Sequence, residues 1–310
     1  MSFGRNILMN HSHIKNLINL GFLVDEEIAN RIENLNEEDF YKLIESLKKE
    51  KVYIITKDLL NKVLSEEVEI LSQFKPIKSL TINDFVKMLN ERYNSLQNIL
   101  LNKVELKNIV SINKASSGNV SIIGLVKEIT EKNSNVLVVL EDPTGDIETL
   151  IDKNLTGKLS LDDVIAVSGN INNKILFVDK LLFPGIPLRP VNYSEESVKI
   201  AFLPNKKPNN AEYVIYKNKI EDKIKKKTYD IIDPCFIKIK NITILVIFGF
   251  DPLNVINKRY VKKDNIDFLI EEIPDILFTD NKVNMSYKGV SIVSLDKIID
   301  LKTREVKNIV

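Results

Sequence analysis

The residue types that most often carry metal or nucleophilic chemistry are scarce in this chain. Two histidines are present, His11 and His13, and both lie within the first thirteen residues. A hydrolase with two metal ions needs several imidazoles and carboxylates to hold ions that activate water and neutralise phosphate oxygens. Because no imidazole follows His13, we expect no metal-dependent hydrolysis, and no metal role for these two terminal histidines. The single Cys235 excludes an internal disulfide and a cysteine-based zinc site.

Lysines are the other group that could take part in chemistry, because their ammonium groups can contact phosphate. The formal net charge is only +1, so the chain has no global basic field for nucleic acid. A run such as residues 223–227 is more often the solvated face of a helix, and we favour that interpretation. Contact with DNA is therefore expected through a partner or through a local set of lysines: Lys206, Lys207, Lys223, Lys225, Lys226 and Lys227.

Length and hydropathy bound the class of protein. A chain of 310 residues is expected to form two or three domains. The first residues lack the apolar run of a signal peptide, and no later stretch approaches the length of a membrane span. We therefore expect a cytoplasmic protein with no membrane contact.

Residues 1–75 have the pattern of a small helical domain with one short extended segment. Polar capping residues precede apolar stripes at spacings of three and four, which is typical of packed helices. Helix starts are predicted at Ser12, Asp25, Asn36 or Asp39, and Thr56, with Gly21 ending the first helix and Val52–Ile55 extended.

Residues 76–117 are predicted to be a linker and one longer helix. Thr81 and Asp84 form a capping-box pattern at its start. The stripe that follows is more often core packing than a binding face, and it consists of Phe85, Leu89, Tyr93, Leu96 and Leu100.

The pattern changes to short β-rich runs in residues 118–190. A polar connector separates the third run from the fourth, which is the order of a five-stranded OB-fold barrel. The turn Asp142–Gly145 contains Pro143 at a position that fixes φ, and it is expected to be a hairpin tip. Gly124 inside the first run would suit the bend that a small barrel needs. The five predicted strands are Val120–Ile129, Val136–Leu140, Asp146–Ile151, Asp163–Gly169 and Lys174–Leu182.

An OB barrel can bind single-stranded nucleic acid through aromatic side chains and basic residues on its open face. The later strands of this barrel offer only Phe177 and Phe183, and the chain contains no tryptophan. Direct binding of single strands is therefore not favoured.

In residues 191–310 the runs ITILVIFGF and Val290–Leu295 have the composition of buried parallel strands.

Three stretches carry a family resemblance: VSIIGLVKEI, VLVVLEDPTGDIETLI and DDVIAVSGNINNKILFVDKLLFPGIP. They resemble the OB domain of the small subunit of archaeal family D DNA polymerase. The preceding DFVKMLNERYNSLQNIL is similar to the helix that leads into that domain, and residues 273–310 are similar to the end of that subunit. The resemblance implies a calcineurin-like phosphoesterase domain after the barrel, and a large partner subunit that carries the polymerase active site.

The ligand motifs that the resemblance implies are altered in this chain. Histidines and aspartates are expected in D-x-H, G-N-H-D and G-H-x-H motifs and at a lone histidine, and the segment with a further G-D motif is absent. Lysine at a ligand position would repel cations, so we expect no metal, cofactor or catalytic residue here. The degenerate ligand positions are Asn205, Lys207, Asn218, Lys219, Phe248, Asn281 and Val283, of which Asn218 keeps the asparagine of its motif.

We therefore expect a multidomain α+β protein: a helical domain (1–75), a linker and helix (76–117), a five-stranded OB-fold barrel (118–190) and a degenerate metallophosphoesterase-like α/β domain (191–310). The expected function is that of a non-catalytic accessory subunit of a replicative DNA polymerase, which binds the large catalytic subunit and has no small-molecule substrate. Deletion of residues up to about 100 is expected to leave that complex intact. Two alternatives stay open, namely a residual 3′–5′ exonuclease or phosphodiesterase and a stand-alone single-stranded-DNA-binding protein.

Overall fold

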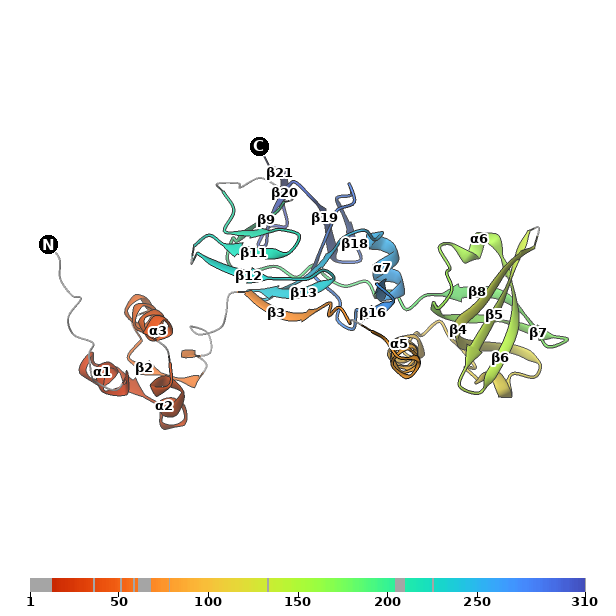
Figure 1. The fold of residues 1–310 in the computed structure, drawn as a ribbon, viewed down its shortest axis with the longest axis horizontal. Coiled ribbons are helices and arrows are strands. Elements are labelled where there is room, and N and C mark those ends of the chain that lie inside the picture. The colour runs from red at the N-terminus through yellow and green to blue at the C-terminus, as the bar shows by residue number, and fades with distance from the viewer. Residues whose placement is uncertain are drawn as a thin grey trace. The chain divides into compact units, whose positions relative to one another are not determined.

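The computed structural model divides the chain into two compact units, residues 1–67 and residues 68–310 (Figure 1). Each unit is described by itself. The structure describes residues 13–35, 37–50, 52–57, 59–60, 68–77, 79–132, 134–203, 210–224 and 226–309. In these residues no helix is both long enough and apolar enough to cross a membrane.

The first unit contains the predicted helices, α1 (His13–Asn19), α2 (Glu26–Glu33) and α3 (Glu37–Glu50). A two-stranded parallel sheet of β1 (Leu23–Val24) and β2 (Ile54–Ile55) accompanies them. Asp25 caps α2 as predicted, because its carboxylate accepts a hydrogen bond from the Glu27 N–H at 3.2 Å. His13 packs in this unit: its ring stacks on Phe40 with centroids 4.1 Å apart, and its Nε2 lies 2.9 Å from the Leu35 carbonyl oxygen. His11 and Ser12 lie outside the described residues.

The boundary of the helical domain lies earlier than we predicted. Strand β3 (Val68–Gln73) pairs antiparallel with β13 (Cys235–Ile239), far along the chain. Val68 is fully buried in the core of the second unit, so this strand is a part of that core. An end of the helical domain at residue 75 is therefore wrong, and a deletion up to residue 100 would remove a strand from the second unit.

The predicted barrel is confirmed. Its five strands close in the order β4–β5–β6–β8–β7, which is the first–second–third–fifth–fourth order of an OB-fold. Asp142 pairs with Gly145 across a two-residue turn, as predicted for the hairpin tip. The bend in the first strand lies at a bulge between Val126 and Glu128, two residues after Gly124. The strands are β4 (Gly118–Lys132), β5 (Asn135–Asp142), β6 (Gly145–Asp152), β7 (Val164–Asn172) and β8 (Ile175–Leu182), with a short helix α6 (Lys153–Thr156) after the third.

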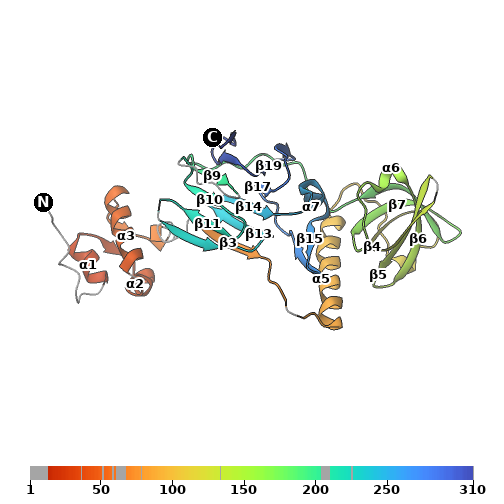
Figure 2. The ribbon, with the colours of Figure 1, turned by 45° about the horizontal axis from the view of Figure 1, so that its top comes forward.

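The rest of the second unit is a sandwich of two six-stranded sheets (Figure 2). One sheet has the order β12–β11–β10–β9–β20–β21 and the other the order β18–β19–β17–β14–β13–β3. Side chains from both sheets share one core, in which Phe202 and Tyr213 of the first meet Ile244 and Phe278 of the second. The remaining strands of the first sheet are β9 (Lys199–Phe202), β10 (Tyr213–Ile215), β11 (Lys219–Asp222), β12 (Lys227–Asp230), β20 (Lys297–Asp300) and β21 (Val306–Asn308). Those of the second are β14 (Ile242–Ile247), β17 (Ile276–Thr279), β18 (Met285–Tyr287) and β19 (Val290–Ser294).

This sandwich contains less helix than the predicted α/β domain. In the described part of residues 191–310 the one helix is α7 (Pro252–Lys258). Short hairpins join half of the neighbouring strand pairs, and such connections leave no room for crossover helices. A separate hairpin of β15 (Tyr260–Lys263) and β16 (Ile266–Leu269) follows α7. The predicted buried parallel strands are confirmed, because β14 and β19 both pair in parallel with β17.

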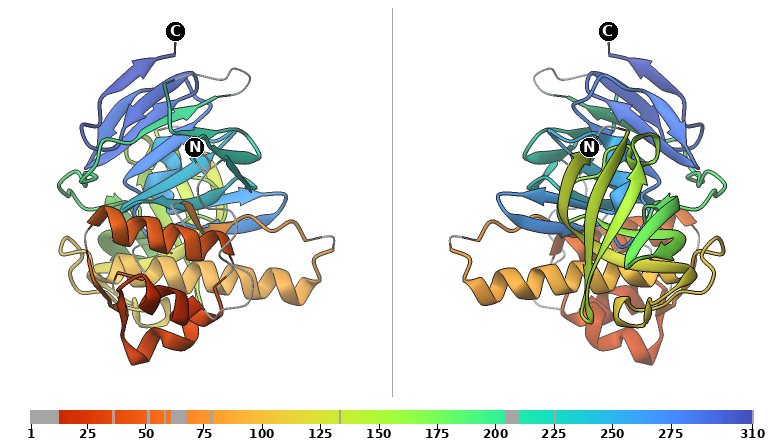
Figure 3. Two further views of the ribbon diagram at one scale, coloured as in Figure 1. Left: turned by 90° about the vertical axis from the view of Figure 1, so that its left-hand side faces the viewer. Right: turned by 90° about the vertical axis from the view of Figure 1, so that its right-hand side faces the viewer.

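The helix expected to form part of a linker is packed into the second unit instead. Helix α5 (Ile82–Leu101) begins with the predicted capping box of Thr81 and Asp84. Its buried residues Tyr93, Leu96 and Leu100 join a cluster with strands β4 and β7 of the barrel. Figure 3 shows α5 as a single long rod, with its beginning extending past the neighbouring strands.

Candidate functional site

Most of the described ligand positions lie at one edge of the sandwich, which we call the carboxyl edge. Strands β14 and β17 run parallel, so residues 248–250 and 279–284 that follow them lie next to each other. In parallel sheets this is the edge where ligands bind. Phe248, Asn281 and Val283, three of the ligand positions that the resemblance implies, lie at this edge.

Aromatic rings from the core between the two sheets pack against the carboxyl edge. Phe202, at the end of β9, is fully buried and connects the two sheets. Its ring centroid lies 4.7 Å from that of Phe278 and 5.6 Å from that of Phe248. A phenyl ring has no lone pair for a metal ion, and its volume excludes the waters that would surround one. Phe248 therefore extends the apolar core toward the edge.

The polar side chains at this edge hydrogen-bond to the protein itself. The Gly249 N–H donates to both oxygens of the Asp280 carboxylate, at 2.9 and 3.1 Å. Gly249 has a φ of +77°, a conformation that favours glycine. The Asn281 amide donates to the Phe250 carbonyl oxygen at 2.7 Å. These contacts tie the residues after β17 to those after β14.

The last residues of the carboxyl edge also form hydrogen bonds and apolar contacts within the protein. The Asn284 amide oxygen accepts from the Ser294 N–H at 3.1 Å, and its nitrogen donates to the Ser294 hydroxyl at 3.0 Å. Val283 packs against an apolar cluster under α7. Across the described ranges, no group of three or more His, Cys, Asp or Glu side chains is placed to hold a metal ion. The residues of the carboxyl edge do not fit a two-metal centre.

The other predicted ligand positions do not join these residues. Asn218 and Lys219 lie at the turn between β10 and β11, in the opposite sheet. The Lys219 ammonium is 2.9 Å from the Glu221 carboxylate and 5.0 Å from the centre of the Tyr216 ring, so local partners neutralise it. Asn205, Lys206 and Lys207 lie outside the described residues.

The lysine run lies in a hairpin, and the predicted helix face is wrong. Strands β11 and β12 pair antiparallel, and Asp222 faces Lys227 at the turn. The Ile224 N–H donates to the Asp222 carboxylate at 2.9 Å, which favours a turn over a helix. This turn lies at the opposite end of β11 from Lys219. The described lysines of the run are therefore separated from Lys219 by the length of β11, and Lys225 lies outside the described residues.

A buried charged junction holds α5, the barrel and the β15–β16 hairpin together. Arg92 of α5 is fully buried, and its guanidinium lies 2.9 Å from the Asp267 carboxylate of β16. The same guanidinium lies over the Tyr260 ring at 4.7 Å from its centre. Burial raises the pKa of Asp267, although the nearby Arg92 opposes that shift. The sequence signal for this residue was its spacing, because Arg92 follows Phe85 and Met88 at helical intervals.

The barrel contributes a second carboxylate to this junction. Asp163 is 1% exposed and accepts a hydrogen bond from the Tyr260 hydroxyl at 2.8 Å. The Lys258 ammonium at the end of α7 lies 2.7 Å from the same carboxylate. Burial raises the pKa of Asp163, and its hydrogen bonds oppose the shift. An isolated charge would be too costly here, so these groups depend on one another.

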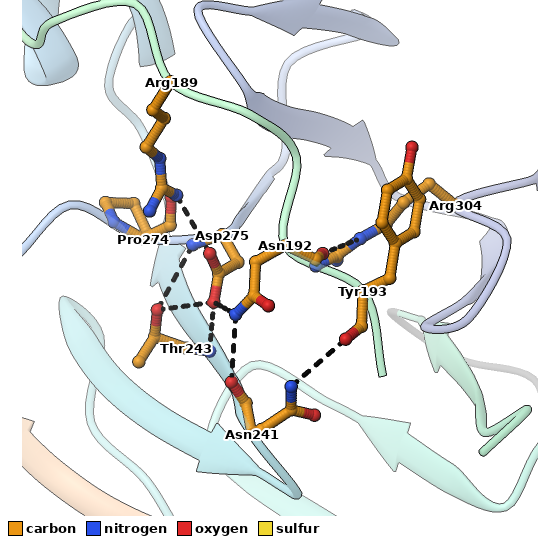
Figure 4. Close-up of polar contacts among 8 residues, drawn as sticks. All are labelled: Arg189, Asn192, Tyr193, Asn241, Thr243, Pro274, Asp275 and Arg304. Atoms are coloured by element: carbon orange, nitrogen blue, oxygen red, sulfur yellow. Dashed lines mark hydrogen bonds and ion pairs between the residues drawn. The ribbon is translucent and has the colours of Figure 1, made fainter. Parts of the chain in front are cut away.

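The strap that joins the barrel to the sandwich, residues 183–198, is also fixed (Figure 4). Asp275, only 3% exposed, accepts hydrogen bonds from Arg189 at 3.0 Å and from Asn192 at 3.1 Å. The Thr243 N–H and hydroxyl donate to the same carboxylate at 2.9 and 3.0 Å. Further bonds run from Arg304 to the Asn192 carbonyl oxygen and from Asn241 to the Tyr193 carbonyl oxygen. The strap is thus fixed to the sandwich around the buried Asp275 carboxylate.

The open face of the barrel has a shallow cleft of about 790 Å³ with mixed charge. Lys127 is already paired with Asp146 at 3.1 Å and with Glu141 at 3.7 Å. Phe177 is 44% exposed outside this cleft, whereas Phe183 packs against the barrel core. The charged side chains that line the cleft are Lys127, Glu128, Asp146, Glu148 and Lys174, with more carboxylates than ammonium groups.

Comparison with known proteins identifies sequence relatives. No family model matches the chain. It is 30% identical over 131 residues to the DNA polymerase II small subunit of Methanothermobacter thermautotrophicus, which covers 39% of this chain and 27% of that protein. This chain is a relative of the archaeal DNA polymerase II small subunits. The small subunit of Archaeoglobus fulgidus is 29% identical over 125 residues, or 39% of this chain and 25% of that protein. The matches thus span about a quarter of the length of these relatives, and the predicted resemblance is confirmed.

Solved structures overlap this chain only in part. An OBody bound to hen egg-white lysozyme covers 26% of the chain at 14% identity with a TM-score of 0.24. The Stn1–Ten1 complex of S. pombe covers 21% at 18% identity with a TM-score of 0.20.

Proposed function

We propose that this chain is a non-catalytic accessory subunit of a replicative DNA polymerase of the archaeal DNA polymerase II type, and that it binds the large catalytic subunit. The observation that carries the proposal is the sequence relation to five curated small subunits. A subunit of this kind works where the chromosome lies, which supports a cytoplasmic location.

The carboxyl edge supports the absence of catalysis in this proposal. We interpret the sandwich as a degenerate metallophosphoesterase domain, in which Asn205, Lys207, Asn218, Lys219, Phe248, Asn281 and Val283 replace ligands. Phe248 packs toward the core, and Asn281 is bonded to the Phe250 carbonyl oxygen. Residues committed to packing and to backbone contacts cannot also hold two ions, so no cofactor or small-molecule substrate is proposed.

The junction and the strap support a role in binding. Arg92, Asp163 and Asp275 are each buried and each contact a different part of the second unit. Buried charged contacts that are shared by several elements restrict the relative movement of those elements. We propose that the barrel and the sandwich meet the catalytic subunit as one rigid surface, while residues 1–67 are dispensable for this contact.

Contact with DNA is assigned mainly to the complex. The barrel cleft holds more carboxylates than ammonium groups, which opposes binding of phosphate along it. Six lysines are kept as candidate phosphate contacts in the complex, and three of them lie in the described hairpin: Lys223, Lys226 and Lys227. The remaining three are Lys206, Lys207 and Lys225.

Purification from native extract tests this function. A tagged chain expressed at its natural level should retain the polymerase catalytic subunit, identified by mass spectrometry, through washing with salt. The purified chain should not degrade DNA in the presence of Mn²⁺. Recovery without any polymerase subunit would contradict the accessory role, and manganese-dependent degradation by the chain alone would support the exonuclease alternative.

A further inference from the structure

The first half of α5 presents apolar side chains that do not belong to the core of the second unit. Ile82 is 83% exposed and Val86 is 49% exposed. With Leu89 and the buried Tyr93 they follow one another at spacings of four, three and four, so they form one stripe that is exposed at its start and joins the core at Tyr93. Exposed apolar residues that occur singly need no explanation, but a continuous stripe marks an interaction site.

These turns of the helix are stable without a covering element. The Asp84 N–H donates to the Thr81 hydroxyl at 3.2 Å, and the Thr81 N–H donates to the Asp84 carboxylate at 3.1 Å. The capping box satisfies two of the backbone groups that a helix start leaves without partners. Ile82 and Val86 are therefore held in position in the absence of contacts from their own side chains.

The adjacent side of α5 fixes its orientation. Lys262 of β15 lies 5.8 Å from the centre of the Phe85 ring, and the Asp267 N–H of β16 is 3.1 Å from the Met88 sulfur. Arg92 continues this side into the charged junction. Because this face is anchored on the β15–β16 hairpin, the stripe with Val86 and Leu89 faces elsewhere, toward the barrel.

A groove of about 310 Å³ separates the stripe from the barrel. Tyr93 closes one end of it, where its hydroxyl donates to the Ile123 carbonyl oxygen at 3.2 Å. The β5–β6 hairpin forms the far wall, and Asp142 holds it by accepting from the Ile112 N–H at 2.9 Å and the Thr144 N–H at 2.7 Å. The groove is lined by Val86, Leu89, Asn90, Tyr93, Leu125, Glu141, Asp142 and Pro143.

The rim of this groove is acidic. Glu141 and Asp142 line it, and Asp146 lies on the next strand of the same hairpin. Lys127 is the ammonium group that pairs with them, 3.7 Å from Glu141 and 3.1 Å from Asp146. The residues that line the groove include two carboxylates, Glu141 and Asp142, and no ammonium group, which leaves an excess of negative charge beside an apolar floor.

We propose that an amphipathic helix of the catalytic subunit lies in this groove, with its apolar face on Ile82, Val86 and Leu89 and basic residues toward Glu141 and Asp142. A helix fits because ridges spaced four residues apart on α5 accept the ridges of a second helix. The proposal rests on the proposed function, since it takes its partner from there. The new element is the groove as the docking site, with apolar contacts along α5 and charge pairing at the acidic rim.

The test compares two double variants with the wild-type full chain. Ile82→Gln with Val86→Lys removes the apolar stripe and adds a positive charge that repels a basic helix. Leu188→Gln with Ile232→Lys is the matched control, because these residues are 83% and 44% exposed outside the groove. Affinity for the purified catalytic subunit is measured by calorimetry, and the melting temperature of each chain is measured without partner. We expect the groove variant to bind at least tenfold more weakly at an unchanged melting temperature, and the control to bind like wild type.

Each other outcome contradicts a distinct part of the proposal. Equal affinities for wild type and both variants would overturn the groove as the docking site, although the accessory function would stand. Failure of the wild-type chain to bind the catalytic subunit would overturn both. A lower melting temperature of the groove variant alone would mean that the chain covers its own groove. A wild-type dimer that becomes monomeric in the groove variant would assign the groove to a second copy of the chain.

Discussion

The carboxyl edge of the sandwich and the first half of α5 are built in opposite ways. At the edge, Asp280 and Asn281 are bonded to backbone groups and Phe248 packs against Phe202. On α5, Ile82 and Val86 are exposed although the helix is already capped and anchored. The polar groups of the edge are hydrogen-bonded within the protein, whereas α5 leaves apolar side chains exposed to solvent.

This difference indicates which property of the molecule was retained. A hydrolytic edge must keep polar groups free for ions and substrate, at a cost in stability. Here that edge is closed, while a rigid helix and a rigid hairpin flank an open apolar groove. Under the proposed function, the second unit acts through the surface at this groove.

The largest expected difference between the two regions comes from truncating one apolar side chain in each of them. Phe202→Ala should lower the free energy of unfolding by about 3–5 kcal/mol, because a fully buried ring that contacts two others is removed. Ile82→Ala should change it by less than about 0.5 kcal/mol. Unfolding by denaturant measures both values. Similar losses for the two variants would mean that Ile82 is a core residue in the folded chain.

Elements with a strong local pattern could be predicted from the sequence. The barrel strands alternate with clear turn residues, and Thr81, Asp84 and Asp25 carry caps that the structure confirms. These signals act within a few residues, so no knowledge of the rest of the chain is needed. The position of Phe248 and Asn281 at one edge followed from the family resemblance.

Features that depend on distant partners could not be predicted. Strand β3 joins the sandwich through β13, which is more than 160 residues away, and no local pattern encodes that pairing. Arg92 is buried only because Asp267 and Tyr260 meet it. The lysine run was assigned to a helix by composition, whereas the pairing of β11 with β12 makes it a turn. Tertiary context decided each of these cases.

A smaller effect should come from the polar closure of the carboxyl edge. Asp280→Ala should reduce the free energy of unfolding by about 1 kcal/mol, because the Gly249 N–H loses its acceptor in a partly solvated position. Asp179→Ala removes an exposed carboxylate on the barrel and serves as the matched control. Equal stability of the two variants in denaturant titrations would show that Asp280 does not hold the edge closed.

The smallest expected effect is a pH dependence at the charged junction, which distinguishes it from the solvated edge. Burial raises the pKa of Asp163 above 3.8 in the folded chain. The stability that this shift contributes is therefore fully present below the unfolded pKa and is lost as the pH rises through the folded pKa. The unfolding free energy of wild type minus that of Asp163→Asn should fall as the pH rises above 3.8. A difference that grows with pH would show that the paired ionised form dominates.

The central claim is that this chain acts by binding the catalytic subunit through its second unit. Size-exclusion chromatography with light scattering, on the purified chain mixed with the purified catalytic subunit, tests it most directly. The account predicts that the two co-elute, and that a chain lacking residues 1–67 co-elutes equally well, because the unit boundary precedes β3. Separate elution of the full chain and the catalytic subunit would contradict the account. Co-elution that is lost on removal of residues 1–67 would contradict it as well, because the interface would then lie in the first unit.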